Sequence, residues 1–383
     1  MALETAAPAQ AKPIILDLSR SELEREVVDA MGQSRFRAKQ IWQALHRECI
    51  LDFEHITTLP KALRAQLAER YIADPIEKVY HLTSADRSTD KALFRLPDGE
   101  LVETVLMRYV ADNHRKARKT VCVSTQAGCA LGCTFCATGQ QGFRRQLTTG
   151  EIVAQIIFMQ RIALAEDRAE VETGERDLGS LQGVTNVVFM GMGEPLANYD
   201  NTMSAIRSIN DANGLAIGAR HITLSTVGLV PQILELAGEN IQINLAVSLH
   251  APDDETRSET MPINRRYPIA TLLSACRRYV ELTDRRIFFE YVLLQGQNDT
   301  TAHARKLGEQ LSGMLCHVNL IPVNPTADGP YQRPGRDQAD RFQNVLRRYG
   351  VPSTVRIEKG IDIDAGCGQL RARAVDTEAL GSS

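Results

Sequence analysis

Short apolar runs alternate with amphipathic stretches of helical spacing along the chain from Thr120 onward. The apolar runs predict strands at Val121–Gln126, Asn186–Gly191, His221–Thr226, Ile243–Leu249, Ile287–Leu294 and Val318–Pro322. The stretches between them include predicted helices at Gly150–Leu164, Asn201–Ala212, Ile269–Leu282 and Thr301–Met314. This alternation is typical of parallel βα units, so we predict an α/β fold with a partial, open (β/α)6 barrel. Reactive side chains of such a fold lie at the C-terminal ends of its strands.

The N-terminal part of the chain has a different pattern, and residues 1–80 are predicted to form a helical accessory domain. Its helices are expected at Ser21–Met31, Arg37–Cys49 and Pro60–Tyr71. The basic residues Arg35, Arg37 and Lys39 could face RNA, although a solvated surface is an equal alternative.

A β-hairpin extension and a basic linker are predicted at 81–119, because Lys91–Leu96 and Leu101–Arg108 flank the turn sequence Pro97-Asp98-Gly99. The catalytic domain is then expected at 120–373, with a polar surface insertion at Glu166–Leu181 and a tail at 374–383.

The composition limits the classes of protein that the chain can represent. A chain of 383 residues that is 43% hydrophobic can bury a large core. The start of the chain has no signal-peptide pattern, and no run approaches the ~18 apolar residues that span a bilayer, so we expect a cytoplasmic protein without a membrane partner. A net charge of -3 argues against an overall basic protein. Basic residues cluster locally at His114–Lys119, Arg144-Arg145, Arg265-Arg266 and Arg285-Arg286, where they could contact phosphates or face solvent.

Cys129, Cys133 and Cys136 form a C-x3-C-x2-C run directly after the first predicted strand. Three thiolates at this spacing can hold a four-iron cluster and leave one iron open to another ligand. A zinc site with Cys122 as fourth ligand is the alternative, but structural zinc favours paired C-x2-C half-sites. Cys49, Cys276 and Cys316 lie in apolar or helix-like segments and are expected to be buried without a chemical role.

Polar residues follow several of the later predicted strands. Gly193 and Glu194 belong to the turn Met190-Gly-Met-Gly-Glu-Pro195, where glycine allows close approach and a carboxylate can pair with an ammonium group. Other such groups follow the later strands. Each one alone could cap a helix or form hydrogen bonds with the loop backbone, but together they predict a binding site. These groups are Ser225, Ser248, Leu249, His250 and Asn324.

Cys367 lies between Gly366 and Gly368 near the end of the chain, which favours a mobile loop that approaches another backbone closely. Asp362 and Asp364 place negative charge beside it in the sequence. We expect this charge to disfavour a thiolate on Cys367, and a positively charged ligand bound opposite would restore the balance.

Taken together, these motifs resemble those of the RlmN family, radical S-adenosylmethionine enzymes that convert adenosine in RNA to 2-methyladenosine. The resemblance runs from about residue 15 to about residue 373. It rests on VETV around Glu103, CVSTQAGCALGCTFCATGQQGF from Cys122, GMGEP, SLHAP and DIDAGCGQL.

The resemblance implies a radical S-adenosylmethionine barrel with a [4Fe-4S] cluster held by the C-x3-C-x2-C cysteines, and two molecules of S-adenosylmethionine consumed per turnover. It implies that Gly193 and Glu194 hold the methionine part of the cofactor, and that Ser225, Ser248, Leu249, His250 and Asn324 contact its ribose and adenine. Cys367 would carry the methyl group to RNA, Cys122 would release the product through a transient disulfide, and Glu103 would act as a general acid-base residue.

The resemblance also implies partners: 23S ribosomal RNA near the peptidyl-transferase centre, the transfer RNA adenosine 3′ of the anticodon, and an electron donor such as a flavodoxin or a ferredoxin. We expect a monomer. Two alternatives are a Cfr-type enzyme that methylates C8 of the same ribosomal adenosine, and a zinc-stabilised RNA-binding protein without catalysis. The long helical N-terminal part favours the C2 enzyme over the C8 enzyme.

Overall fold

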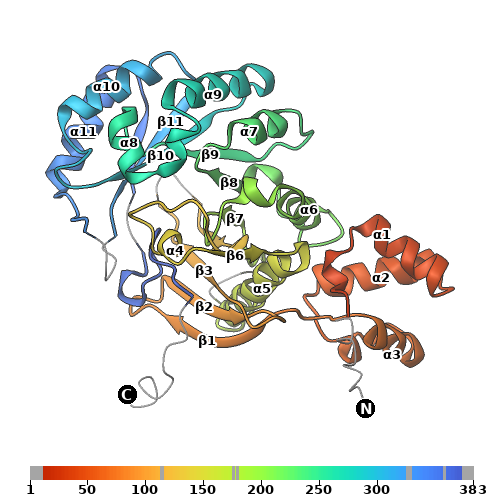
Figure 1. The fold of residues 1–383 in the computed structure, drawn as a ribbon. Helices are drawn as coiled ribbons and strands as arrows, with labels where there is room; N and C mark the ends of the chain where they lie inside the picture. Colours follow the sequence, from red (N-terminus) through yellow and green to blue (C-terminus); the bar gives the residue numbers. More distant parts are fainter. Residues whose placement is uncertain are drawn as a thin grey trace, which may run out of the picture.

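Ten strands form one continuous sheet in the computed structural model, in the order β1-β2-β3-β4-β7-β8-β9-β10-β11-β12 (Figure 1). The structure describes residues 12–112, 116–174, 177, 181–324, 330–356 and 359–372. The seven strands that follow β3 in this order pair with one another in parallel. They are β4 (Arg118–Cys122), β7 (Asn186–Phe189), β8 (Ile222–Thr226), β9 (Asn244–Ser248), β10 (Ile287–Leu293), β11 (Cys316–Pro322) and β12 (Ser353–Val355).

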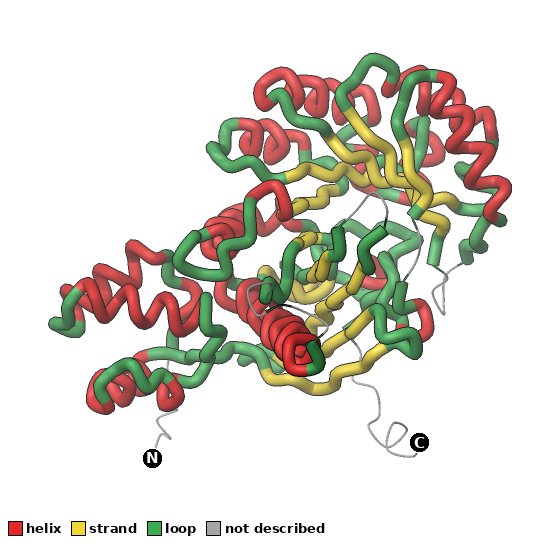
Figure 2. The backbone as a smooth tube through the Cα atoms, turned by 180° about the vertical axis from the view of Figure 1, so that it is seen from behind, coloured by secondary structure: helices red, strands yellow, loops and turns green. Residues whose placement is uncertain are grey.

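Helices connect the parallel strands and cover the outer face of the curved sheet (Figure 2). The connecting helices are α5 (Thr149–Glu172), α6 (Tyr199–Asn210), α7 (Val230–Ala237), α8 (Asp254–Thr260), α9 (Ile269–Thr283), α10 (Thr301–Leu311) and α11 (Arg336–Arg348). Among the described strands, β1 and β12 are the two edges and do not pair with each other. The predicted α/β fold with an open, partial barrel is therefore confirmed.

Three antiparallel strands extend the barrel sheet on one side. They are β1 (Glu77–Thr83), β2 (Thr89–Arg95) and β3 (Leu101–Tyr109), and β3 pairs with β4 through the register Val105↔Cys122. The predicted hairpin is present as β2 and β3. Strand β1 was not predicted, because its residues are mostly exposed or half-buried and show no apolar alternation.

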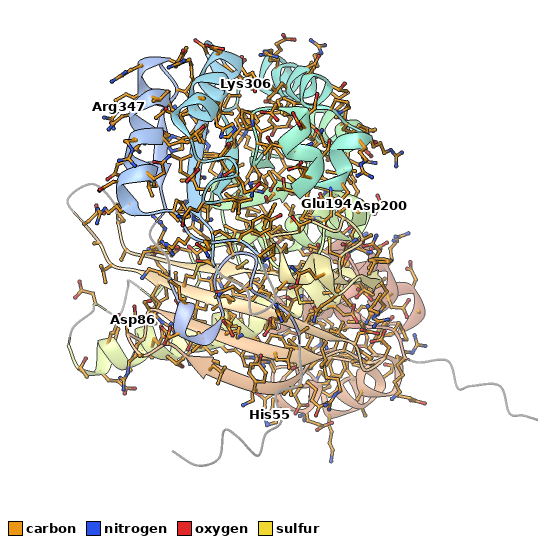
Figure 3. All side chains as sticks on the ribbon, turned by 60° about the vertical axis from the view of Figure 1, so that its left-hand side comes forward. His55, Asp86, Glu194, Asp200, Lys306 and Arg347 are labelled. Carbon is orange, nitrogen blue, oxygen red and sulfur yellow. The ribbon has the colours of Figure 1, made fainter. Side chains whose placement is uncertain are left out.

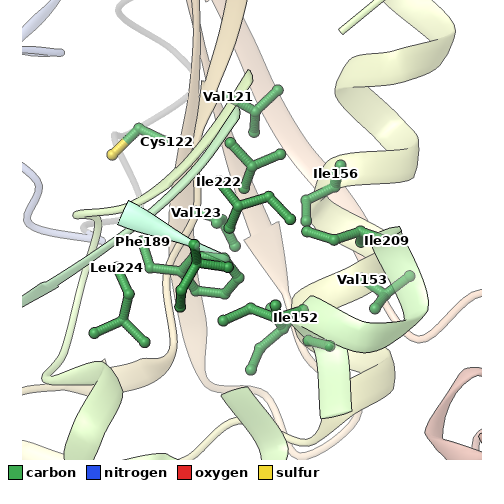
Figure 4. Packing of buried hydrophobic residues seen from close by; sticks show 14 of the residues in the cluster. Val121, Cys122, Val123, Ile152, Val153, Ile156, Phe189, Ile209, Ile222 and Leu224 are labelled. Atoms are coloured by element: carbon green, nitrogen blue, oxygen red, sulfur yellow. The ribbon is translucent and has the colours of Figure 1, made fainter. Parts of the chain in front are cut away.

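The apolar core lies between the parallel strands and the connecting helices. Figure 4 shows Ile152, Val153 and Ile156 of α5 packed against side chains of the strands. All three are fully buried, as are Val121, Phe189 and Ile222 on the strands. The Cys122 thiol points to the opposite side of the sheet from α5 (Figure 4). Alternation along β4 therefore places a valine in the core and the next side chain toward the barrel interior.

The N-terminal helices α1 (Arg20–Arg25), α2 (Arg35–His46) and α3 (Lys61–Arg70) form a separate group beside the sheet (Figure 1). The preceding segment docks on the start of α5, where the Asp17 carboxylate accepts a hydrogen bond of 2.7 Å from the Gly150 amide. A Cβ on Gly150 would lie 2.6 Å from Ile14, so glycine permits this close contact.

Two boundaries predicted for the catalytic domain differ from those in the structure. The expected insertion at Glu166–Leu181 is helical at its start, because α5 continues to Glu172 and its residues are ion-paired: Lys119 lies 2.7 Å from Asp167. Part of the remaining insertion lies outside the described residues, as do His114 and the tail. The expected strand Val121–Gln126 ends at Cys122 as β4, and Gln126 begins a separate short hairpin.

Cys49, Cys276 and Cys316 are buried, as predicted. Within the described residues, no helix is both long enough and apolar enough to cross a bilayer.

Candidate active site

The three clustered cysteines lie on the loop between β5 (Gln126–Gly128) and β6 (Phe143–Gln146). The Cys129 amide donates a hydrogen bond of 2.9 Å to the Gly142 carbonyl, which closes the base of the loop. Gly128 has φ of 73°, and a Cβ there would collide with that carbonyl oxygen. Glycine at this position is therefore required for the hairpin to begin the cysteine loop.

The thiols of this loop face a shared, mostly buried space. Burial raises the pKa of Cys129 to about 11, and the neighbouring Cys136 thiol adds to the increase. Burial, followed by Cys136 and Cys129, raises the pKa of Cys133 as well. The three thiols are thus close enough to interact electrostatically, and a bound metal centre would reverse the effect because a coordinating thiol is deprotonated.

A cavity of about 980 Å³, which includes space open to solvent, lies where the parallel strands end, and it is called the first cavity below. Most of the predicted site residues line it: Cys129, Cys133, Cys136, Gly193, Glu194, Ser225, Ser248, His250, Asn324 and Cys367. The fold thus brings together groups from β7, β8, β9 and β11 with two loops far apart in the sequence.

Glu194 is a buried carboxylate in this cavity, with 2% of its surface exposed. Its Oε2 accepts a hydrogen bond of 2.8 Å from the Val227 amide, and its Oε1 accepts one of 3.0 Å from the Leu196 amide. Burial nevertheless raises its pKa to about 7. A cation beside Glu194 would restore the ionised form, so the site suits an ammonium group.

His250 lines the same cavity and is held in one orientation. Its Nδ1 accepts a hydrogen bond of 2.9 Å from the Val292 amide, and its ring meets Phe135 edge-on at 4.8 Å between centroids. Burial lowers its pKa to about 3. The neutral ring therefore has its proton on Nε2 and can donate one hydrogen bond.

Asn324 and Leu249 were both predicted to contact the cofactor, but they lie in different surroundings. Asn324 donates a hydrogen bond of 3.2 Å to the Cys367 carbonyl, while its buried Oδ1 has no hydrogen-bond partner among the described residues. Leu249 is fully buried and does not line the first cavity, so its side chain belongs to the core.

The Cys367 loop docks directly on the cluster loop. The Ala137 amide donates a hydrogen bond of 2.8 Å to the Gly368 carbonyl, and Thr138 Oγ1 donates one of 2.8 Å to the Leu370 carbonyl. A Cβ on Gly366 would lie 2.5 Å from Asn324 Nδ2. The glycines beside Cys367 therefore permit close backbone packing, as predicted from their flanking positions.

A second cavity of about 720 Å³ adjoins the first and contains both remaining thiols of interest. Cys122 and Cys367 both line it, and Cys122 is 8% exposed. Burial, followed by the nearby Cys367 sulfur, raises the pKa of Cys122 to about 12. The two cavities share Cys136, Asn324, Arg356, Cys367 and several apolar residues.

Arg356 is a site residue that sequence reasoning missed. Its Nη1 lies 3.6 Å from Cys367 Sγ, within hydrogen-bond range for sulfur, and 4.0 Å from Glu290 Oε2. Glu290 is itself buried, lines the first cavity and has a raised pKa caused by burial. Both residues stand in ordinary strand or loop sequence, so no local motif marked them.

Asp362 and Asp364 were expected to disfavour a thiolate on Cys367, but the structure gives their carboxylates other partners. Asp362 instead accepts a hydrogen bond of 2.8 Å from the Ala85 amide, and Asp364 accepts one of 3.4 Å from Gln369. The charged group beside the Cys367 sulfur is the guanidinium of Arg356. Residues near in sequence point elsewhere because the chain turns sharply at Asp364, whose φ is 52°.

Glu103, expected as an acid-base residue, lines neither cavity in this structure. Its Oε1 accepts a hydrogen bond of 2.8 Å from the Tyr80 hydroxyl and lies 3.3 Å from Lys91 Nζ. Its Oε2 accepts hydrogen bonds from the amides of Arg371 and Ala372. The carboxylate thus holds the segment that follows the Cys367 loop.

The residues present fit the cofactors that the motifs imply. Three thiols share one cavity with a buried carboxylate that suits an ammonium group, and the buried oxygens Asn324 Oδ1 and Glu290 Oε2 lack hydrogen-bond partners among the described residues. Within those residues, no three His, Cys, Asp or Glu side chains converge on a point for one ion. In Figure 3, Glu194 lies below the outer helices that carry Lys306 and Arg347 and above the turn between β1 and β2 that carries Asp86.

Two protein families match the chain. The family described as the radical SAM superfamily matches residues 123–307, and the family described as the ribosomal RNA large subunit methyltransferase N-terminal domain matches residues 15–72. The first match contains the cysteine loop and the Gly193-Glu194 turn, and the second contains the N-terminal helices.

Several named proteins and one solved structure are similar over nearly the whole chain. The "Dual-specificity RNA methyltransferase RlmN 1" of Myxococcus xanthus is 48% identical over 95% of this chain and 96% of its own length. The "Probable dual-specificity RNA methyltransferase RlmN" of Alkaliphilus oremlandii is 48% identical over 94% and 97%. The crystal structure of a radical SAM methyltransferase from Sphaerobacter thermophilus has a TM-score of 0.86 at 49% identity, covering 94% of this chain and 100% of that one.

Proposed function

Because the chain belongs to the RlmN family of radical S-adenosylmethionine RNA methyltransferases, we propose that it methylates C2 of adenine in 23S ribosomal RNA and in transfer RNA. The chain is an RNA methyltransferase that uses a [4Fe-4S] cluster and S-adenosylmethionine. The non-catalytic zinc alternative does not fit this membership. The position of methylation and the two RNA substrates are the proposed part.

The observation that carries the proposal is the position of Cys367. Its loop is hydrogen-bonded to the cluster loop through Ala137 and Gly368 at 2.8 Å, and Cys367 lines both cavities. A thiol that borders both spaces can accept a methyl group on one side and deliver it on the other. Cys122 faces only the second cavity, where a product would be released.

The chemistry of the target explains why a carrier thiol is required. C2 of adenine is an electron-poor aromatic carbon, so it does not attack a methyl sulfonium as a nucleophile. Cys367 instead takes the methyl group by displacement, in which its sulfur forms the new C–S bond and S-adenosylhomocysteine leaves. When bound, the cluster and a second S-adenosylmethionine supply the radical that removes a hydrogen atom from this S-methyl group.

Cys122 is proposed to release the methylated RNA. After the methylene carbon has bonded to C2, the ring must lose its proton and one electron, and the oxidised cluster, when bound, would accept that electron. RNA is then joined to Cys367 through a thioether. Attack of the Cys122 sulfur on the Cys367 sulfur forms a disulfide and breaks the C–S bond. The electron pair of that bond remains on the methylene carbon, which takes a proton to become methyl.

The cluster ligands are proposed to be Cys129, Cys133 and Cys136, with Glu194 and Gly193 around the methionine part of S-adenosylmethionine. Ser225, Ser248, His250 and Asn324 are proposed to contact the nucleoside part. Two observations support this role: Asn324 Oδ1 has no hydrogen-bond partner among the described residues, and His250 has a proton on Nε2 that it can donate. The target base must leave its stack to reach the second cavity.

The proposal is tested by product analysis. The purified protein is incubated anaerobically with S-adenosylmethionine, a reductant and either 23S ribosomal RNA or transfer RNA that lacks the modification. Nucleosides from digested RNA are then separated and identified by mass spectrometry. Formation of 2-methyladenosine in both RNAs is expected, whereas 8-methyladenosine would assign the Cfr-type activity and reject C2 methylation.

A further inference from the structure

The two cavities differ in the sign of their charged residues. The first cavity contains Glu194 and Glu290 together with Arg356. Among the residues that the structure describes, the charged residues that line the second cavity are Arg356 and Lys359, and no Asp or Glu lines it. A space lined by one sign of charge attracts a ligand of the opposite sign. The second cavity is therefore built for an anionic ligand, and it also holds both reactive thiols.

Two cations and an aromatic ring meet at the edge of the second cavity. Tyr109 and Lys359 both line it, and Lys359 Nζ lies 5.1 Å from the centre of the Tyr109 ring. The Arg118 guanidinium lies 4.1 Å from the same ring, and Arg118 is the cross-strand partner of Tyr109. The ring thus holds two positive charges in place through cation–π contacts. We call Tyr109, Arg118 and Lys359 the cationic rim.

The charges of the cationic rim are available for a ligand. Neither Arg118 nor Lys359 forms an ion pair with a carboxylate among the residues that the structure describes. The Asp86 carboxylate is fully exposed. Hydrogen bonds from Ser84 and Ser88 lower its pKa, and the Lys359 charge adds a smaller decrease. Solvent screens an exposed carboxylate of this kind, so it neutralises little of the lysine charge.

Lys359 and the reactive thiol belong to one structural segment. Gly360 directly after Lys359 has φ of 64°, and a Cβ there would lie 2.7 Å from Thr89, so the turn is packed against β2. The segment then leads to Cys367 within the same cavity lining. A phosphate held by Lys359 would therefore lie at a set position relative to the Cys367 sulfur.

We propose that the cationic rim binds the RNA phosphates next to the target adenosine and so positions that nucleotide in the second cavity. This inference rests on the proposed function, since it takes RNA as the substrate. Lysine and arginine beside an aromatic ring are the groups that hold a nucleic acid backbone without reading its sequence. The rim would serve ribosomal and transfer RNA alike, because phosphates are common to both.

The test is RNA binding by the full-length, cluster-loaded protein in which Lys359→Gln or Arg118→Gln removes one charge. Binding of an RNA stem-loop is measured at several salt concentrations by fluorescence anisotropy. Each variant is expected to raise Kd by about five- to tenfold at 0.1 M salt and to lower the slope of log K against log salt by about 0.7 to 1. Lys359→Arg keeps the charge and is expected to retain binding.

Arg305→Gln is the matched control, because Arg305 is an exposed arginine on the outer helix α10 and its loss changes net charge equally. Iron content and thermal midpoint show that each variant is folded. Wild-type Kd and slope in both Lys359→Gln and Arg118→Gln, or an equal loss in Arg305→Gln, would overturn the cationic rim. Failure of the proposed function is separate, since it appears as absence of 2-methyladenosine with the wild-type protein.

Discussion

The buried carboxylate of Glu103 on β3 accepts a hydrogen bond of 2.8 Å from the main-chain amide of Arg371. The two residues are 268 positions apart in the chain. Lys91 supports the contact from β2, with its Nζ 3.3 Å from Glu103 and 3.4 Å from the Asp364 carbonyl. The hairpin extension therefore contacts the chain on both sides of Cys367, and we expect Glu103 to help position that thiol.

Removal of the Lys91 charge is expected to loosen this segment. In Lys91→Met the buried Glu103 carboxylate loses its cation, which should lower the free energy of unfolding by about 3 kcal/mol. Hydrogen exchange of a peptide spanning 359–372, followed by mass spectrometry, should be faster than in the wild type.

The matched control is Arg95→Met on the same strand β2. Arg95 pairs with Glu77 at 3.1 Å, but both side chains are largely exposed, so the expected loss is below about 1 kcal/mol. Unchanged exchange of 359–372 in Lys91→Met would show that the hairpin does not hold the segment.

Cys122→Ala is expected to trap RNA on the enzyme. Without the second thiol, the thioether between RNA and Cys367 has no resolving group in the second cavity. After reaction with S-adenosylmethionine and reductant, a covalent protein–RNA species should be visible on a denaturing gel and should disappear on ribonuclease treatment. Cys276→Ala, which removes a buried core thiol, is the control and should give no adduct. Free methylated RNA as the product of Cys122→Ala would remove Cys122 from the resolving role.

Glu194→Gln is expected to weaken S-adenosylmethionine binding while the cluster is retained. The substitution keeps the shape of the side chain but removes the charge that pairs with an ammonium group, which is worth about 1.5 to 3 kcal/mol or roughly tenfold or more in Kd. Anaerobic equilibrium dialysis measures Kd, and iron analysis measures the cluster. Glu235→Gln, an exposed position on α7, should bind as the wild type. Wild-type affinity in Glu194→Gln would contradict the assigned contact.

His46 is expected to make the junction of the N-terminal helices and the barrel sensitive to acid. His46 stacks on Trp42, and both pack against Gly214, while burial lowers the His46 pKa from 6.5 to about 4. The folded protein favours the neutral ring, so this contribution to stability is complete above pH 6.5 and is lost as the pH falls toward 4. The loss should reach about 1 kcal/mol by pH 5.5.

His46→Phe keeps a stacked ring without titration, so its thermal midpoint should fall less than that of the wild type between pH 7.5 and 5.5. The control is His55→Phe, because His55 is exposed and its loss should leave the acid sensitivity in place. Equal falls in wild type and His46→Phe would show that His46 is not the sensitive group.

Local sequence was sufficient to predict the elements whose buried apolar residues recur at regular positions. The six predicted parallel strands all have counterparts, because at least half of the residues in each strand are buried and most of the buried ones are apolar. Shorter or more polar elements were missed. Strand β12 has three half-buried residues, and α5 extends beyond its apolar stretch because its last turns are held by ion pairs such as Lys119–Asp167.

The sequence by itself determined the chemistry that the protein carries: three cysteines at cluster spacing, a carboxylate after a glycine turn, and a cysteine between two glycines. These signals are local, since ligand spacing and backbone freedom depend on neighbouring residues. The tertiary structure decided which groups surround the Cys367 sulfur, placing Arg356 there and turning Asp362 away. It also decided that Glu103 binds the segment that follows the Cys367 loop and that Tyr109 contacts two cations. Electrostatic and hydrogen-bond contacts act through space, so they depend on segments that only folding brings together.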